Sequence, residues 1–202
     1  MVKPKIKICG LTRICDIEAV NTLLPDYVGF VFTKSRRQVS PGNAKKLRNI
    51  LAKSIIPVGV FVNESIDLIT DIVKNGIISM IQLHGDEDEK YINDLKKLVC
   101  VPVIKSVAVH KKGDVQVFDT SSADYLLLDN KSGGTGCIFN WDLIGVSDKP
   151  YFLAGGLNYN NVLEAITRST PFAVDVSSGV ETNGFKDFIK IKDFTERVRN
   201  GE

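Results

Sequence analysis

Short apolar runs alternate with longer stretches of helical periodicity about eight times along this chain. The runs are rich in β-branched and aromatic residues, which is typical of buried strands. They predict strands at Lys5–Cys9, Tyr27–Phe32, Pro57–Val62, Ile78–Leu83, Val101–Val107, Asp124–Leu128, Tyr151–Ala154 and Phe172–Val176. Strands that alternate with helices form parallel sheets with right-handed crossovers, and eight such units close a (β/α)₈ barrel. The expected fold is therefore a single-domain α/β barrel over residues 1–202.

The barrel must be a short one. It has 202 residues, whereas about 250 are typical of this fold, so loops and some helices are expected to be minimal. The segment 108–123 has the weakest helical pattern, and only a brief helix is expected at Asn140–Asp142. A doubly wound open sheet is the alternative. It is disfavoured because Gly10, after the first strand, lacks the other glycines of a dinucleotide-binding turn.

Several residues predict where helices begin. Ser40 followed by Pro41 is typical of an N-cap and a first helical position. Asn63 is expected to cap the helix after the third strand, and Asn158 the helix after the seventh. The core-facing positions of the first helix are expected at the apolar residues that recur at helical spacing. These are Ile14, Ile17, Val20, Leu23 and Leu24.

Charge and cysteine usage narrow the class of protein. The net charge of +2 is too small to indicate nucleic acid or a membrane surface as a partner. No apolar tract is long enough to span a membrane, and the N-terminus lacks the apolar core of a signal peptide. Cys9, Cys15, Cys100 and Cys137 show no zinc-type spacing and are expected to be reduced thiols in a cytoplasmic protein.

In a barrel the carboxyl ends of the strands line one mouth, where chemistry is expected. Cys9 closes the first strand and is either a reactive thiol or an inert buried residue. Asp129 follows an apolar strand and is either a turn residue or a general acid with a raised pKa. His84 is the only imidazole at a strand end, and either assists proton transfer or has a structural role. Arg37 offers a clamp for a carboxylate or phosphate, or is a solvated loop residue.

The last two strand ends are followed by small-residue loops, AGGL at Ala154–Leu157 and VSSG at Val176–Gly179. Backbone N–H groups in such loops, with a helix start behind them, form an anion cradle. Phosphate sites in barrels often use these two loops. The alternative is that the glycines only permit tight turns. A further glycine-rich loop is expected at Ser132–Gly136. The strand ends show neither a metal-ligand group nor a serine-hydrolase partner set.

A series of motifs runs along the chain from about Lys5 to Val198: KICGLTR, GFVF, SRRQVSP, VGVFVN, IQLHGDE, LLLD before GGTG, FNW, AGGLN and FAVDVSSGVE. The order of these motifs resembles the phosphoribosylanthranilate isomerase family of tryptophan biosynthesis. Small departures occur: Thr33 stands where an aromatic–proline pair is frequent, Ala154 replaces a frequent serine, and the last loop lacks the usual proline and second lysine.

This resemblance implies a (β/α)₈ aldose–ketose isomerase that performs an Amadori rearrangement without cofactor or metal on a small phosphorylated substrate. It implies Cys9 and Asp129 as catalytic residues and Arg37, His84 and Asp175 as substrate-binding residues. It implies a phosphate site built from Gly155, Gly156, Ser178 and Gly179. Asp129 would protonate the ribose ring oxygen and a Cys9 thiolate would then remove the proton from C2. Positive charge such as Lys7, or oriented dipoles, is expected to favour that thiolate.

Two other functions stay open at this point. A related phosphosugar barrel, indole-glycerol-phosphate synthase, relies in its family on lysine and glutamate at strand ends, which the matching positions here do not show. A catalytically silent barrel that binds a phosphorylated ligand is the second alternative, and the intact Cys9 and Asp129 argue against it. Both a monomer and a homodimer are compatible with so short a barrel.

Overall fold

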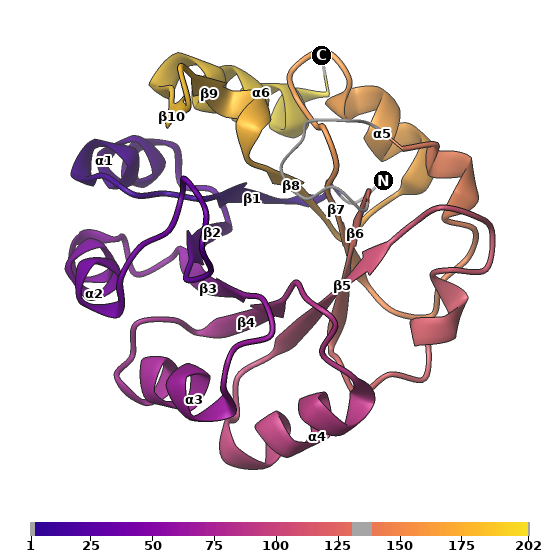
Figure 1. The fold of residues 1–202 in the computed structure, drawn as a ribbon. Helices are drawn as coiled ribbons and strands as arrows, with labels where there is room; N and C mark the ends of the chain where they lie inside the picture. The colour runs from indigo at the N-terminus through magenta and orange to yellow at the C-terminus, as the bar shows by residue number, and fades with distance from the viewer. Residues whose placement is uncertain (1–2, 131–138, 202) are drawn as a thin grey trace.

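Eight parallel strands form a closed barrel in the computed structural model, which describes residues 3–130 and 139–201 (Figure 1). The predicted fold class is confirmed. The strands are β1 (Lys5–Cys9), β2 (Tyr27–Val31), β3 (Ile56–Phe61), β4 (Met80–Leu83), β5 (Val103–Ala108), β6 (Tyr125–Asp129), β7 (Tyr151–Leu153) and β8 (Ala173–Val176). Each pairs with its neighbour in chain order, and β1 pairs with β8, with Lys7 opposite Asp175, to close the barrel.

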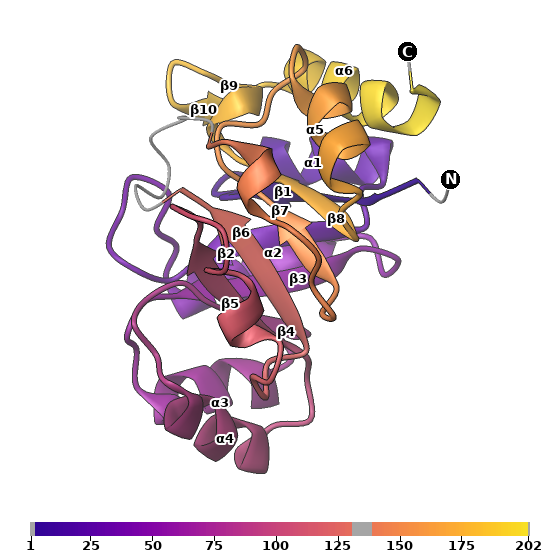
Figure 2. The same cartoon turned by 90° about the vertical axis from the view of Figure 1, so that its right-hand side faces the viewer.

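Helices surround the barrel strands, and most of these helices are regular α-helices (Figure 1). They are α1 (Ile14–Leu23), α2 (Pro41–Ile50), α3 (Ile66–Lys74), α4 (Glu89–Leu98), α5 (Val162–Ser169) and α6 (Phe188–Asn200). After β5 and β6 the described chain has only the 3₁₀ turns η1 (Gln116–Phe118) and η2 (Trp141–Leu143), which makes the barrel short as expected. Figure 2 shows α3 beside α4 at one end of the molecule and α1, α5 and α6 grouped at the other. A third 3₁₀ turn, η3 (Ser178–Val180), leads into the hairpin of β9 (Glu181–Thr182) and β10 (Phe185–Lys186).

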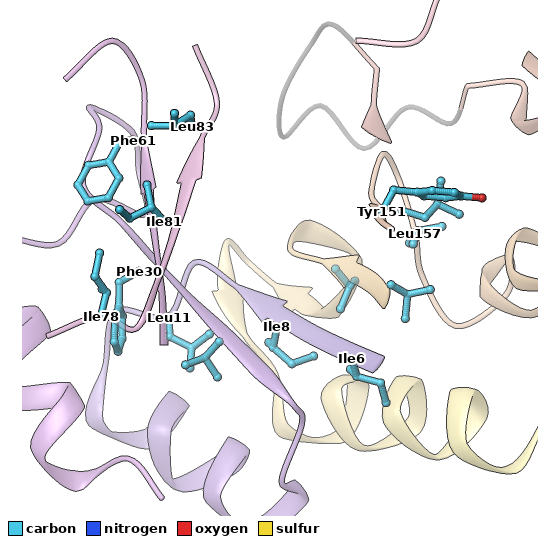
Figure 3. Close-up of a cluster of buried hydrophobic side chains, with 14 of the residues drawn as sticks. Ile6, Ile8, Leu11, Phe30, Phe61, Ile78, Ile81, Leu83, Tyr151 and Leu157 are labelled. Carbon is cyan, nitrogen blue, oxygen red and sulfur yellow. The ribbon is translucent and has the colours of Figure 1, made fainter. Parts of the chain in front are cut away.

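The strands bury both faces because side chains alternate between the barrel interior and the surrounding helices. Outward residues such as Ile6 and Ile8 pack toward α6, as Figure 3 shows. A second cluster of buried residues lies mostly in the first halves of the strands, with the Tyr27 and Phe152 rings in edge contact at 5.2 Å. Its buried members are Tyr27, Val58, Met80, Ile104, Leu127, Phe152, Ala154 and Ala173. This apolar plug fills the lower barrel, which is the part toward the amino ends of the strands, while its member Ala154 reaches the cavity at the carboxyl ends.

Helix starts agree with the sequence at Ser40 and approximately at Asn158, and differ from it at Asn63. Ser40 caps α2 by accepting from the Asn43 amide, as predicted. The expected cap at Asn63 is wrong: Asn63 has a positive φ of 49° and accepts from the Asp86 amide, while Ser65 caps α3. The cap expected near Asn158 agrees approximately: Asn158 Oδ1 accepts from the Asn160 amide and its carbonyl accepts from the Val162 amide, in the turn that leads through Asn161 into α5.

The apolar stripe of α1 is also narrower than the sequence pattern indicated. Ile17 and Val20 are fully buried, but Ile14 is 62% exposed and Leu24 is 49% exposed. Leu24 ends the helix in the left-handed conformation, which turns its side chain away from the helix face. The glycine-rich loop Ser132–Gly136 and Cys137 lie outside the described residues.

Candidate active site

A cavity of about 290 Å³ opens at the carboxyl ends of the strands. It brings together eight of the nine residues that the sequence and the resemblance assigned to catalysis or binding, from six strands or the loops that follow them. These are Cys9, Arg37, His84, Asp129, Gly155, Gly156, Asp175 and Ser178. The ninth, Gly179, is not part of the lining, although its neighbour Ser178 is. Thr33 and Ala154, where the chain departs from the family pattern, also line the cavity.

Cys9 faces the barrel interior at the end of β1 and contacts Val31 and Val60. Strand pairing places it opposite Gly29 of β2. A Cβ at Gly29 would lie 2.5 Å from the Cys9 Sγ, so only glycine leaves room for the thiol there. Burial raises the pKa of Cys9, while the positive charges of Lys7 and Lys186 act to lower that pKa. Lys7 acts in the expected direction, because its charge lowers the pKa of Cys9. The expectation is wrong for the pKa as a whole, because desolvation raises it by more than Lys7 lowers it.

Lys7 lies two residues before Cys9 on the same face of β1 and is fully buried. Its ammonium is 2.9 Å from Asp175 Oδ2 and donates to Gln82 Oε1 at 2.8 Å. Burial is the largest single effect and would lower the pKa of Lys7, but Asp175 and Cys9 together outweigh it, so the pKa is raised. The lysine is therefore a permanent cation beneath the cavity. Among the described residues, Asp175 Oδ1 has no hydrogen-bond partner.

The contact between Lys7 and Gln82 also sets the state of His84. Since Gln82 Oε1 accepts from Lys7, the Gln82 amide nitrogen is the donor at 3.0 Å from His84 Nδ1. The histidine then carries its proton on Nε2, 4.0 Å from Asp129 Oδ2. Burial, assisted by the Lys7 charge, lowers the pKa of His84. A neutral imidazole with an N–H directed to the cavity is thus a hydrogen-bond donor, not a cation.

Asp129 ends β6 and its residue is 9% exposed. Burial raises the pKa of Asp129 to about 6, partly offset by the hydrogen bond that Oδ1 accepts from the Asn130 amide at 2.7 Å. A carboxyl with that pKa keeps part of its protons near neutral pH, which is the state that a general acid requires.

Arg37 reaches the cavity from the loop after β2 and is not a solvated loop residue. Its side chain is 13% exposed and binds Glu181 through two nitrogens, Nε at 2.7 Å and Nη2 at 3.0 Å. Glu181 and Lys186, a buried lysine that also binds the Ser177 carbonyl, were missed at the sequence level. Gln82 was missed as well. Its only sequence signal was the alternation that places it on the same face of β4 as the cavity residues.

The two small-residue loops meet at the cavity edge. A Cβ at Gly179 would lie 2.0 Å from the Leu157 carbonyl oxygen, so the loop after β8 packs directly on the loop after β7. The prediction of helix starts directly behind these loops is wrong for regular helices. Helix α5 begins only at Val162 and α6 only at Phe188, with η3 and the β9–β10 hairpin intervening after β8. Backbone amides of the loops themselves remain the candidate anion donors.

Residues 3–130 and 139–201 contain neither a candidate metal centre nor a candidate membrane span. No group of three or more histidine, cysteine, aspartate or glutamate residues in these ranges could hold a metal ion. No helix within them is long and apolar enough to cross a membrane.

Comparisons with known proteins agree with one another. A family model described as N-(5'phosphoribosyl)anthranilate (PRA) isomerase matches residues 6–197. The N-(5'-phosphoribosyl)anthranilate isomerase of Clostridium acetobutylicum is 49% identical, over 96% of this chain and 98% of that protein. That of Endomicrobium trichonymphae is 45% identical, over 98% of this chain and 99% of that protein.

Solved structures give the same result. The phosphoribosyl anthranilate isomerase of Thermotoga maritima superimposes with a TM-score of 0.89 at 36% identity, covering 98% of this chain and 99% of that one. The enzyme of Thermus thermophilus gives 0.89 at 27% identity, covering 98% and 100%. The resemblance inferred from the motifs is confirmed: the chain belongs to the N-(5'phosphoribosyl)anthranilate (PRA) isomerase family.

Proposed function

We propose that this protein converts N-(5-phosphoribosyl)anthranilate into 1-(2-carboxyphenylamino)-1-deoxyribulose 5-phosphate in tryptophan biosynthesis, with Asp129 as general acid and Cys9 as general base. The observation that carries this proposal is that both groups line one cavity, and that the pKa of Asp129 is raised to about 6. A phosphoribosyl anthranilate isomerase with 34% identity has been solved with reduced 1-(o-carboxyphenylamino)-1-deoxyribulose 5-phosphate, a reduced form of this product.

In the first step, Asp129 donates its proton to the ribose ring oxygen, the C1–O bond breaks, and the anilino nitrogen supplies electrons to form the protonated Schiff base. In the second step, the Cys9 thiolate takes the proton from C2 and the electron pair neutralises the iminium nitrogen, giving an enolamine. Tautomerisation of the enolamine yields the ketone. The chemistry calls for no cofactor or metal, because the iminium nitrogen is itself the electron acceptor.

The remaining cavity residues suit the binding of such a substrate. Arg37 would pair with the anthranilate carboxylate, because a guanidinium matches a carboxylate in charge and geometry. Asp175 Oδ1, which has no hydrogen-bond partner among the described residues, and the His84 Nε2–H would bind sugar hydroxyls. Amides of Gly155, Gly156 and the Ser178–Gly179 turn would hold the phosphate. The protein is expected to act in the cytoplasm, as a monomer or homodimer; one relative from Thermotoga maritima is described as dimeric.

The test follows the loss of anthranilate-type fluorescence when purified protein meets freshly generated phosphoribosylanthranilate, with a chelator present. Wild type should turn over, while Asp129→Asn and Cys9→Ala should each lose at least about 100-fold in kcat, the usual contribution of a general acid or base. Matched controls are Asp67→Asn on the exposed side of α3 and Cys100→Ala, an exposed thiol. Inactive wild type would favour the silent ligand-binding barrel, and fully active variants would refute the assigned roles.

A further inference from the structure

Glu181 lies at the centre of a cluster of three cations beside the cavity. Its Oε1 accepts from Arg37 Nε at 2.7 Å and from Lys186 Nζ at 2.6 Å. Its Oε2 accepts from Arg37 Nη2 at 3.0 Å and from Arg36 Nη2 at 2.7 Å. The side chain of Glu181 is only 4% exposed, and its partners Arg37 and Lys186 are largely buried as well, whereas Arg36 approaches from the solvent side with a side chain that is 57% exposed. A single carboxylate thus binds the loop after β2 to the segment after β8.

The Arg37 side chain is confined along its stem as well as at its head. A Cβ at Gly10 would lie 2.5 Å from Arg37 Cδ, so the arginine passes directly over the Gly10 backbone. Gly10 also has a φ of +85°, which L side chains rarely adopt. The glycine of the KICG segment therefore leaves space for the arginine stem, while Glu181 fixes the direction of the guanidinium plane.

A guanidinium has two edges that can each bind a carboxylate. Glu181 takes the side edge of Arg37, formed by Nε and Nη2. Within residues 3–130 and 139–201, Glu181 is the only carboxylate that pairs with Arg37, so the terminal edge, formed by Nη1 and Nη2, can take a second one; Arg37 also lines the cavity. The three cations of the cluster exceed its single carboxylate by two charges, so an incoming anion still meets net positive charge.

We propose that Glu181 is a positioning residue that aims Arg37 at the carboxylate of the substrate, and that it thereby selects N-aryl aminoaldoses whose aromatic ring carries an acidic group. The proposal rests on the proposed function, because it assumes that the aromatic carboxylate is bound at Arg37. It goes further by assigning the specificity for that carboxylate to a residue that makes no contact with the reacting atoms.

The test compares two substrates that differ only in the carboxylate. N-(5-phosphoribosyl)anthranilate carries it, and N-(5-phosphoribosyl)aniline, formed by the corresponding amine, lacks it. For Glu181→Gln, kcat/KM on the first should fall about 10- to 100-fold, mainly through KM, because a misdirected guanidinium loses a charge-assisted contact. On the aniline substrate the same variant should change less than about 3-fold. For each substrate, kcat/KM of the variant is divided by kcat/KM of wild type, so the different intrinsic reactivities of the two substrates cancel.

A double-mutant cycle separates an effect through Arg37 from one through Lys186, which also loses a partner in Glu181→Gln. In the Arg37→Gln background, adding Glu181→Gln should produce no further loss on the anthranilate substrate. An equal further loss there would assign the effect to Lys186 and overturn the proposal. Equal losses on the two substrates, or unchanged or increased activity on the anthranilate one, would overturn it as well.

Glu164→Gln is the matched control. It removes an exposed glutamate that pairs with Arg168 on α5, and it should leave kcat/KM on both substrates unchanged. Thermal unfolding of each variant checks that a loss on one substrate is not a loss of folded protein. A wild type with no isomerase activity would refute the proposed function itself, whereas a failed Glu181 result with active wild type would refute only this inference.

Discussion

Burial has opposite consequences for the two residues proposed to move protons. It raises the pKa of Asp129 to about 6, which helps an acid that must hold its proton near neutral pH. It also raises the pKa of Cys9, which hinders a base that must first lose its proton. Lys7 and Lys186 partly offset that second effect. The productive form, protonated Asp129 with ionised Cys9, is therefore a minority state of the unliganded site at every pH.

The pH dependence of kcat/KM follows from these directions. Below pH 6 Asp129 stays protonated and the thiolate fraction grows about tenfold per pH unit, so activity should rise. Above about pH 6 the loss of protonated Asp129 offsets that growth, and a plateau should extend to the raised Cys9 pKa before activity falls. In Asp129→Asn the residual activity should continue to rise above pH 6, because no acid is being lost.

Wild type and the variant share one substrate, so ionisation of its phosphate cancels in their ratio. The measurement is kcat/KM from pH 5 to pH 10 for both proteins. A flat residual profile in Asp129→Asn between pH 6 and pH 8 would contradict the assignment of the lower pKa to Asp129.

Strand pairing decides how much room each site residue has. The register of β1 against β2 sets Cys9 opposite Gly29, and the register of β1 against β8 sets Lys7 opposite Asp175. A shift of one residue would turn each of these side chains to the outer face. Helix caps contribute less to the site: Ser65, the cap of α3, does not line the cavity. Among the elements, the strands therefore influence the site most, through the register in which they pair.

Gly29→Ala, a change on β2, tests whether the space opposite Cys9 is needed for activity. The new Cβ would meet Cys9 Sγ at 2.5 Å and the Cys9 Cα at 3.1 Å, so the thiol or its strand must move. We expect the free energy of unfolding to fall by about 1–3 kcal/mol and kcat to fall at least about 10-fold. Gly42→Ala on α2, where a Cβ meets nothing within 4 Å, is the control and should not reduce stability or kcat. Normal kcat in Gly29→Ala would show that the thiol position is not critical.

At the scale of the whole molecule, the buried pair of Lys7 and Asp175 joins the first and last strands of the barrel. Both charges lie above the apolar plug of the lower barrel, and Gln82 completes the hydrogen bonds of the lysine. A buried pair of this kind contributes little over an apolar substitute of the same shape, but removal of one member leaves an uncompensated charge. The buried polar group of Lys7, Asp175 and Gln82 thus serves the site and adds little to the stability of the fold.

Lys7→Met should lower the free energy of unfolding by about 3–5 kcal/mol, because Asp175 is left buried without its cation. Lys5→Met is a matched control on the same strand: Lys5 pairs with Asp26, and that lysine side chain is 53% exposed, so about 0–1 kcal/mol is expected. Urea unfolding of wild type, Lys7→Met and Lys5→Met at pH 7 measures the loss of unfolding free energy in each variant. Equal small losses would mean that Asp175 finds another partner or a proton when Lys7 is removed.

Local sequence patterns determined the order of the strands and the position of the main site residues in this protein. Alternation of apolar runs predicted the eight strands and the barrel, and the strand-end positions of Cys9 and Asp129 pointed to the mouth, because period and turn residues depend only on near neighbours. The tertiary structure alone decided which side chains meet. Arg37 and Glu181 stand 144 positions apart, and Lys7 and Gln82 stand 75 apart. Such pairs, and the desolvation that sets the direction of each pKa shift, exist only once the barrel has closed and excluded water.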